Sequence, residues 1–315
     1  MNFDRELKYK DIILSPKLSE LRSRSEASTK VQLGAKEFTV PVVPANMRTV
    51  ISKKLANYFS ENNYFYIMHR FDVDPVQFCE KASDWQTVSI SLGVQKQDKD
   101  YVSLLASKAL KVDYVTVDIA HGHSILMKEM LHHIKSKLPD TFIIAGNVAT
   151  ANAVKDLEAW GADCIKAGIG QGHVCTTKDK TGFTRPMFSC VLECASATDL
   201  PVIADGGVVS NGDIAKALVA GAKMVMAGSL FSGCTNSPAA SVVVNGKIYK
   251  QYFGSASEHN KGEKKHVEGV MREMPCNNMS YQEKLVEIKQ DLQSAISYAG
   301  GNDISCLKNV GWNLQ

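Results

Sequence analysis

The sequence lacks any strong excess of charge. Its 36 lysines and arginines stand against 33 aspartates and glutamates, which gives a formal net charge of +3 over 315 residues. A protein that binds nucleic acid or an acidic membrane surface normally carries a basic face, and no cluster of basic and aromatic residues occurs here. We therefore expect neither nucleic acid nor a membrane as a partner.

The sequence also lacks a membrane span, a signal peptide and paired metal-type cysteines. No apolar run is long enough to cross a bilayer, and Met1–Glu6 carries acids where a signal peptide needs bases. Eight cysteines occur without a Cys-x-x-Cys pair, which favours free thiols in a reducing compartment over disulfides or structural zinc. These absences predict a soluble, cytoplasmic protein.

Short runs rich in β-branched residues alternate with segments whose apolar residues recur at helical spacing. This alternation predicts a parallel sheet with right-handed crossovers, and eight such units close into a (β/α)8 TIM barrel, here one domain over residues 1–315. An open doubly wound sheet is less favoured, because no Gly-x-Gly-x-x-Gly follows the first strand. The predicted strands are Val40–Val43, Tyr64–Met68, Thr87–Leu92, Tyr114–Val117, Phe142–Ala145, Cys164–Lys166, Val202–Ala204 and Met224–Ala227.

The chain after the eighth predicted strand carries a hairpin signal. Asn245-Gly246 supplies the two positive-φ positions of a type I′ turn, so Ser241–Phe253 is predicted to form a β-hairpin. The polar, glycine-containing stretch that follows predicts a mobile active-site flap, so that hairpin and flap together occupy about 241–280. A closing helix is expected over Tyr281–Ala299.

One cysteine lies in a polar, glycine-rich loop, predicted over about 168–187. Glycines at 168, 170 and 172 allow the backbone to approach a ligand closely. Cys175 at the end of this run is a candidate nucleophile, since reactive thiols need polar, accessible surroundings. The alternative is a buried cysteine that serves only for packing.

Two further glycine clusters follow the last two predicted strands. Asp205-Gly206-Gly207 is followed by a capping-box pattern at Ser210 and Asp213, and Gly228-Ser229 ends the eighth strand. In a barrel, this corner is where backbone N–H groups and a helix N-terminus bind phosphate. The alternative is that both clusters are only tight turns.

Five ordered motifs resemble those of one family across essentially the whole chain. The chain is similar to the family that contains inosine monophosphate dehydrogenase and guanosine monophosphate reductase, and within it to the short bacterial reductases. Near the C-terminus, Asp291–Gly301 also resembles the family's last helix. The motifs are Asp118–Ser124, Gly170–Thr177, Ala204–Gly207, Ala227–Ser229 and Tyr252–Ser255.

Two features favour the reductase branch. The dehydrogenase normally carries inserted regulatory domains, whereas the roughly thirty residues between Gly93 and His121 leave room for one helix and one strand. The dehydrogenase also hydrolyses its intermediate with an Arg-Tyr pair, and this dipeptide does not occur in the sequence.

The resemblance implies an irreversible, NADPH-dependent conversion of GMP to IMP with release of ammonia. It makes Cys175 the nucleophile that forms a covalent thioimidate at C2 of the purine, and Thr177 and Glu268 the acid–base pair. It implies contacts from the chain to the nucleotide, to the NADPH and, through backbone carbonyls, to a monovalent cation such as potassium. It also implies a homotetramer.

The residues that match these binding positions fall into three groups. The nucleotide group is Asp205, Gly206, Gly207, Gly228, Ser229, Gly254, Ser255 and Gly269. The cofactor group is Arg70, Asp118, Ile119 and Ala120. The cation group is Gly170, Gly172 and Cys175.

Four other interpretations stay open at this point. The nearest is a dehydrogenase without regulatory domains, which would convert IMP with NAD⁺. A second is a barrel oxidoreductase that binds FMN at the glycine corner, and a third is a nucleotide-binding scaffold without activity. The fourth is a metal hydrolase that uses His121 and His123. The role of His173, where relatives often carry Ser or Lys, is also open between a phosphate contact and a solvated loop residue.

Overall fold

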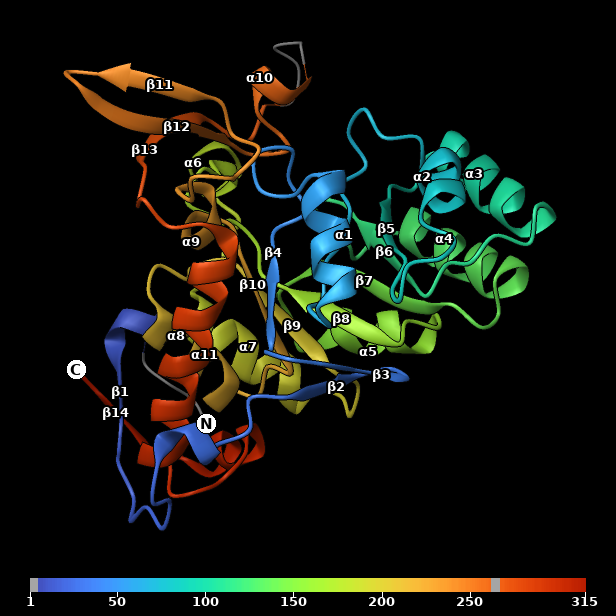
Figure 1. Ribbon diagram of the computed structural model, residues 1–315. Coiled ribbons are helices and arrows are strands. Elements are labelled where there is room, and N and C mark those ends of the chain that lie inside the picture. Colours follow the sequence, from blue (N-terminus) through green and yellow to red (C-terminus); the bar gives the residue numbers. More distant parts are fainter. Residues whose placement is uncertain (1–4, 262–266) are drawn as a thin grey trace.

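The computed structural model describes residues 5–261 and 267–315, and its centre is a curled parallel sheet (Figure 1). The strand order is β4-β10-β9-β8-β7-β6-β5, and every neighbouring pair is parallel. The α/β barrel fold predicted from the strand–helix alternation is confirmed. The strands are β4 (Val42–Pro44), β5 (Ser89–Leu92), β6 (Tyr114–Asp118), β7 (Phe142–Val148), β8 (Cys164–Ala167), β9 (Val202–Asp205) and β10 (Met224–Ala227).

One predicted strand differs from the structure. Tyr64–Met68 lies at the eighth position, beside β5, but forms only an isolated bridge between Met68 and Ile90. Two main-chain hydrogen bonds of Met68, to Ser89 and Ser91, and the packing of buried side chains hold the segment: the Phe65 ring lies 5.0 Å from that of Tyr114. The prediction of a full strand there was wrong because bulky buried aromatics resemble a strand in sequence whether or not a hydrogen-bond ladder forms.

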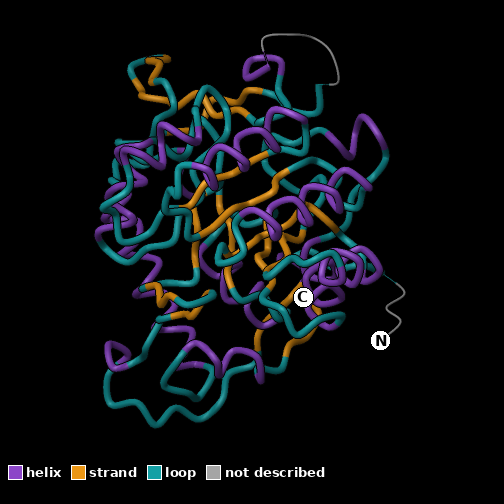
Figure 2. Tube along the Cα trace, turned by 90° about the vertical axis from the view of Figure 1, so that its right-hand side faces the viewer, coloured by secondary structure: helices purple, strands orange, loops and turns teal. Residues whose placement is uncertain are grey.

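Helices surround the sheet, as the turned view in Figure 2 shows. Their starts are encoded locally: Ser124 accepts a hydrogen bond from the N–H of Met127, and the predicted capping box of Ser210 and Asp213 is present. Within the described ranges, no helix is both long and apolar enough to cross a membrane. The helices are α1 (Lys53–Glu61), α2 (Pro75–Lys81), α3 (Lys96–Ser107), α4 (Ile125–Lys137), α5 (Ala151–Ala159), α6 (Thr177–Thr181), α7 (Met187–Ser196), α8 (Asn211–Val219), α9 (Ser229–Ser232), α10 (Glu258–Lys261) and α11 (Tyr281–Tyr298).

A second sheet projects from the barrel at the upper left of Figure 1. The predicted hairpin forms β11 (Ser241–Val244) and β12 (Lys247–Phe253), and Asn245 and Gly246 have the expected positive φ angles of 49° and 73°. The predicted flap contains a strand that the sequence prediction missed, β13 (Met271–Pro275), which pairs with β12. Its mostly exposed side chains explain why no apolar pattern marked it.

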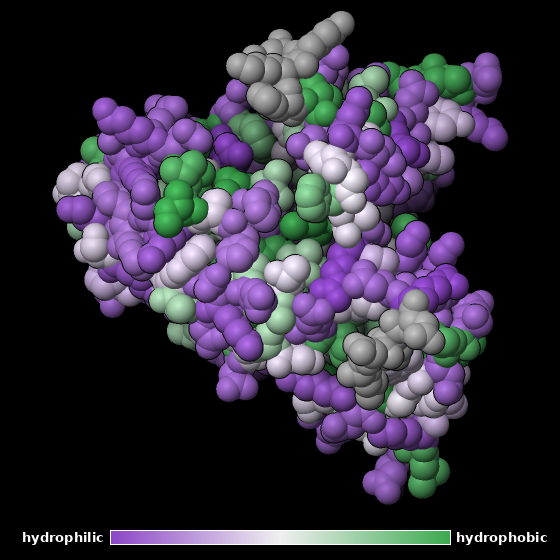
Figure 3. Space-filling model, turned by 180° about the vertical axis from the view of Figure 1, so that it is seen from behind, coloured by the Kyte–Doolittle hydropathy of each residue, from purple (hydrophilic) through white to green (hydrophobic). Residues whose placement is uncertain are grey.

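This second sheet also carries apolar side chains on its surface. Val243 and Ile248 are 71% and 51% exposed. The view from behind in Figure 3 shows a mostly hydrophilic surface, with hydrophobic residues emerging where this sheet projects. Within the hairpin, these apolar side chains are thus exposed, whereas Tyr252 is buried in the core.

One short hairpin covers the other end of the barrel, whereas the terminal segments pair beside α7. The pair is β1 (Ile12–Leu14) with β14 (Trp312–Leu314), and the Trp312 ring lies 4.9 Å from that of Phe188. The hairpin of β2 (Val31–Leu33) and β3 (Lys36–Phe38) lies against the start of β6, where the hydroxyl of Tyr114 donates to the carbonyl of Leu33 at 2.7 Å. These contacts close the amino-terminal end of the barrel, so the carboxyl ends of the strands form the accessible rim.

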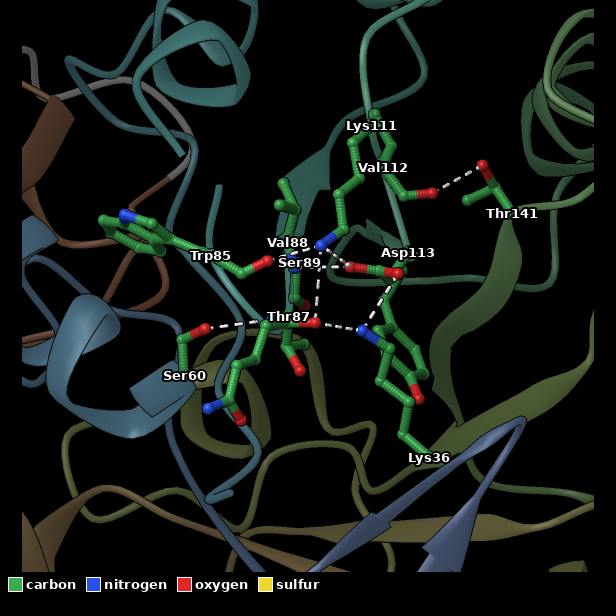
Figure 4. Close-up of polar contacts among 12 residues, drawn as sticks. Lys36, Ser60, Trp85, Thr87, Val88, Ser89, Lys111, Val112, Asp113 and Thr141 are labelled. Atoms are coloured by element: carbon green, nitrogen blue, oxygen red, sulfur yellow. Dashed lines mark hydrogen bonds and ion pairs between the residues drawn. The ribbon is translucent and has the colours of Figure 1, made fainter. Parts of the chain in front are cut away.

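Asp113 organises the polar contacts at this closed end (Figure 4). Its Oδ2 accepts from the buried N–H of Val88 at 2.7 Å, and its Oδ1 lies 3.0 Å from Nζ of Lys36 on β3. Nζ of Lys111 lies 3.9 Å from the same carboxylate. One carboxylate therefore joins the chain ahead of β5, the chain ahead of β6 and the covering hairpin.

Replacing Asp113 should destabilise the fold. We expect Asp113→Ala to lower the free energy of unfolding by about 2 kcal/mol, because it leaves the N–H of Val88 buried without its acceptor. Asp113→Asn retains an acceptor oxygen and should lose about half as much. Urea denaturation of the two variants measures the difference, and an alanine variant with the wild-type midpoint and slope would contradict this role.

Candidate functional site

A cavity of about 570 Å³ opens at the carboxyl ends of the barrel strands. Every residue to which the sequence analysis gave a catalytic, nucleotide, cofactor or cation role lines it. These residues come from widely separated parts of the chain, and the parallel barrel brings them to one rim. The structure thus places the candidates together, while their individual roles remain predictions. They are Arg70, Asp118, Ile119, Ala120, Gly170, Gly172, Cys175, Thr177, Asp205, Gly206, Gly207, Gly228, Ser229, Gly254, Ser255, Glu268 and Gly269.

Cys175 stands at the start of a short hydrogen-bond chain. Its half-buried Sγ donates to Oγ1 of Thr177 at 3.2 Å, and that hydroxyl donates to Oε2 of Glu268 at 2.7 Å. All three side chains face the cavity. The arrangement offers the thiol proton a path to a carboxylate, which is the arrangement of an activated nucleophile and its base.

Main-chain hydrogen bonds hold Glu268 in this position. The N–H of Thr176 donates to the carbonyl of Glu268 at 2.9 Å, and the N–H of Val270 donates to the carbonyl of Val174 at 2.9 Å. On the other side, the N–H of Glu268 donates to the carbonyl of Ala256 at 3.0 Å. The segment around Glu268 is therefore attached to the cysteine loop as well as to the chain after β12.

A buried lysine lies on the floor of the cavity. The side chain of Lys166, on β8, is 3% exposed, and its Nζ lies 2.9 Å from Asp118 and 2.6 Å from Asp205. Asn46 donates to Asp118 at 2.7 Å, and Asn147 donates to Asp205 at 2.8 Å. Two carboxylates, one ammonium and two amides thus form a continuous network beneath the site.

This network fixes the charges of its members. Burial alone would lower the pKa of Lys166, but the two neighbouring carboxylates outweigh it and raise that pKa above its usual range. Burial alone would raise the pKa of Asp118, but Lys166 and Asn46 outweigh it and hold that pKa below its usual value. At neutral pH, Lys166 therefore carries a proton and Asp118 does not.

Sequence reasoning missed the central member of this network. Lys166 ended a predicted strand and received no role, and Asn46 and Asn147 received none either. The available signal was a lone lysine inside an otherwise apolar strand, since buried lysines are rare unless paired. Its partners, which lie on other strands, cannot be identified from spacing along the chain.

Close packing explains one glycine of the proposed phosphate corner. A Cβ on Gly228 would lie 2.2 Å from the hydroxyl of the buried Tyr252, so no larger residue fits there without moving that ring. Gly206 and Gly207 have φ angles of 112° and 74°, in the region that favours glycine. The N–H of Gly207 already donates to the carbonyl of Gln171 at 3.1 Å, so it is not a free donor.

His173 lies at the edge of the cavity, with its ring 6.4 Å from that of Tyr252 in a stacked arrangement. Partial burial, with a smaller effect from Arg272, lowers the pKa of His173. The imidazole is therefore neutral at neutral pH, which favours stacking over a charged phosphate contact.

The metal-hydrolase interpretation receives no support from the histidines. Nε2 of His123 lies 2.7 Å from Oδ2 of Asp156 on α5. In the described parts of the chain, no group of three or more His, Cys, Asp or Glu residues is arranged to hold a metal ion. The position of His123 is explained by this contact with α5.

Comparison with known proteins gives a consistent result. The family model described as "IMP dehydrogenase / GMP reductase domain" matches residues 6–313. A protein named GMP reductase from Staphylococcus carnosus is 50% identical over 308 residues, which cover 96% of this chain and 94% of the relative. Proteins of the same name from Albidiferax ferrireducens and Mesoplasma florum are each 49% identical, over 96% of this chain and 94% and 96% of the relatives.

The hydrogen-bond chain from Cys175 predicts the reactivity of its thiol. Thr177→Val should slow alkylation of Cys175 by iodoacetamide about tenfold at pH 7, because the thiol loses its path to the carboxylate. The matched control is Thr176→Val, since among residues 5–261 and 267–315 Oγ1 of Thr176 has no hydrogen-bond partner. Mass spectrometry of the Cys175 peptide gives the alkylation rate, and equal rates in the two variants would contradict this role of Thr177.

Proposed function

This chain belongs to the IMP dehydrogenase / GMP reductase family, and we propose that it is a GMP reductase, which converts GMP to IMP with release of ammonia. The relatives that carry this name support the proposal. The observation that carries it is the chain of hydrogen bonds from Cys175 through Thr177 to Glu268, inside a cavity of sufficient size for a nucleotide.

In this proposal Cys175 attacks C2 of the purine as a thiolate. The S–C2 bond forms, the C2–N bond to the 2-amino group breaks, and a thioimidate remains on the enzyme. The thiol first loses its proton along the path through Thr177 to Glu268. A covalent intermediate divides one difficult substitution into two easier steps.

The same two residues supply the proton that the leaving group needs. The 2-amino group departs as ammonia only when it is protonated, and Glu268 holds the proton taken from the thiol. Thr177 lies between the two and can donate toward either side. Because backbone bonds hold Glu268 in place, the acid is positioned before the substrate arrives.

The reduction implies a nicotinamide cofactor, and we propose NADPH. When bound, it supplies a hydride to C2. Asp118, Ile119 and Ala120 form the rim on the side of the cavity expected to face the nicotinamide, and the guanidinium of Arg70 is available there for the extra phosphate. Asp205 is assigned to the ribose of the nucleotide, with the glycine corner next to its phosphate.

The reductase is favoured over a dehydrogenase by what connects β5 and β6. Only α3 lies between these strands, so the inserted regulatory domains are absent from that connection. The Arg-Tyr pair expected for hydrolysis of the intermediate is also absent from the sequence. A hydride, and not an activated water, then resolves the thioimidate.

Further properties belong to the same proposal. The carbonyls of Gly170, Gly172 and Cys175 would hold a potassium ion that orders the cysteine loop. A Cβ on Gly170 would lie 2.8 Å from Oγ1 of Thr184, so the bare backbone at this position suits a tight cradle. We propose a cytoplasmic homotetramer, with each chain forming a single domain.

An absorbance assay tests the function. Purified protein with NADPH should show a fall at 340 nm that depends on added GMP and is matched by ammonia release. The parallel reaction with IMP and NAD⁺ should stay flat. A rise in the second cuvette would identify a dehydrogenase instead, whereas a yellow protein that is silent in both would point to a flavin enzyme.

Substitution of the nucleophile tests the mechanism. Cys175→Ala should lose turnover by at least about a thousandfold while it retains GMP binding, because the thiol contributes to bond formation and little to packing. Calorimetric titration with GMP measures the second property. A variant that still turns over at a tenth of the wild-type rate would rule out the covalent step.

A further inference from the structure

Lys166 has no part in the chemistry proposed above, although burial of its charge costs free energy. Its ammonium is almost completely buried at the floor of the cavity, where burial of a charge is tolerated only with strong partners. Those partners are Asp118 and Asp205. Asp205 lies on β9, which neighbours the lysine's own strand β8, and Asp118 lies on β6, two strands away on the other side. Asp118 was assigned to the cofactor and Asp205 to the nucleotide.

The contacts of the individual oxygens show what the lysine controls. Oδ1 of Asp118 binds Lys166, and Oδ2 accepts from Asn46. Oδ2 of Asp205 accepts from both Lys166 and Asn147, at 2.6 and 2.8 Å. Among the described residues, no protein donor reaches Oδ1 of Asp205. The network therefore occupies one oxygen of Asp205 twice and leaves the other for a ligand.

Lys166 also compensates the negative charges of Asp118 and Asp205. Two half-buried carboxylates that share one lysine would repel each other without it. The ammonium offsets this repulsion through its contact with each carboxylate. Several charged or titratable groups face this pair from the surrounding elements. They are Lys166 and Arg70 around Asp118, and Lys166, Tyr9 and Tyr252 around Asp205.

We propose that Lys166 is a positioning residue that orients Asp118 and Asp205 together, so that the cofactor side and the nucleotide side of the cavity depend on one ammonium. The proposal rests on the GMP reductase function proposed above. It requires that loss of Lys166 weakens both halves of the site at once, although the lysine has no direct role in the reaction.

The test is the pH dependence of kcat/KM for Lys166→Met. Without the ammonium, burial raises the pKa of Asp118, so this carboxyl ionises only at higher pH. We expect kcat/KM to fall about tenfold or more at pH 6.5 and to recover toward pH 8.5, while the wild type changes little from this cause. KM for GMP and KM for NADPH should both rise.

Three further variants separate positioning from mere stability. Lys166→Arg keeps the charge, so its kcat/KM should keep the wild-type dependence on pH below neutrality (the acid limb of the profile). The double variant Lys166→Met/Asp118→Asn removes one negative charge together with the positive one. Its kcat/KM should therefore fall at a lower pH than that of Lys166→Met. Lys135→Met is the matched control, because it breaks a lysine–carboxylate pair with Asp163, 2.8 Å apart, that does not line the cavity.

The outcomes distinguish this proposal from the proposed function. A wild-type protein that does not oxidise NADPH with GMP overturns the function, and this inference with it. An active wild type whose Lys166→Met variant keeps the wild-type acid limb and both KM values overturns only the role of Lys166. An equal shift in Lys135→Met also overturns it. If the methionine variant does not fold, Lys166→Gln is measured in its place, and the same two outcomes decide.

Discussion

The site depends on a short stretch of main-chain pairing. Two backbone hydrogen bonds attach the segment around Glu268 to the cysteine loop, and a third attaches it to the chain that follows β12. Without them, Glu268 would be one more charged side chain on a solvated segment. With them, the hydroxyl of Thr177 alone connects Glu268 to the thiol of Cys175. Because the backbone makes these contacts, they constrain the path of the segment more than the identity of its side chains.

The barrel brings the other residues of the site together. Each parallel strand delivers its last residues to the same rim, so Asp118, Lys166 and Asp205 meet although they follow three different strands. The closed end, organised around Asp113, carries the contacts that hold the sheet and its covering hairpin together. Stability and chemistry are thus placed at opposite ends of the strands, and the buried lysine is the exception that brings charge into the core beneath the site.

Local patterns account for what the sequence could predict. Strand–helix alternation indicated the barrel, Asn245-Gly246 indicated the hairpin, and the glycines before Cys175 indicated an accessible thiol. What it could not predict depends on contacts between distant residues. Glu268 received its place only through the resemblance to a family, and Lys166 received none, because its partners lie on other strands. Tyr64–Met68 has the composition of a strand but not its full ladder, since it joins β5 only through the main-chain bonds of Met68 and the packing of its side chains.

The separation between Thr177 and Glu268 along the chain, 91 residues, has a consequence for how the protein matures. Contacts between distant residues require the largest loops to close, and they form after local helices and neighbouring strands. The cysteine loop and its carboxylate can therefore meet only once the strands between them are in place and the chain beyond β12 has folded back. A nascent or partly folded chain carries Cys175 without its hydrogen-bond link to Glu268. Because that link joins two segments so far apart in the chain, its presence marks the completion of folding at this end of the barrel.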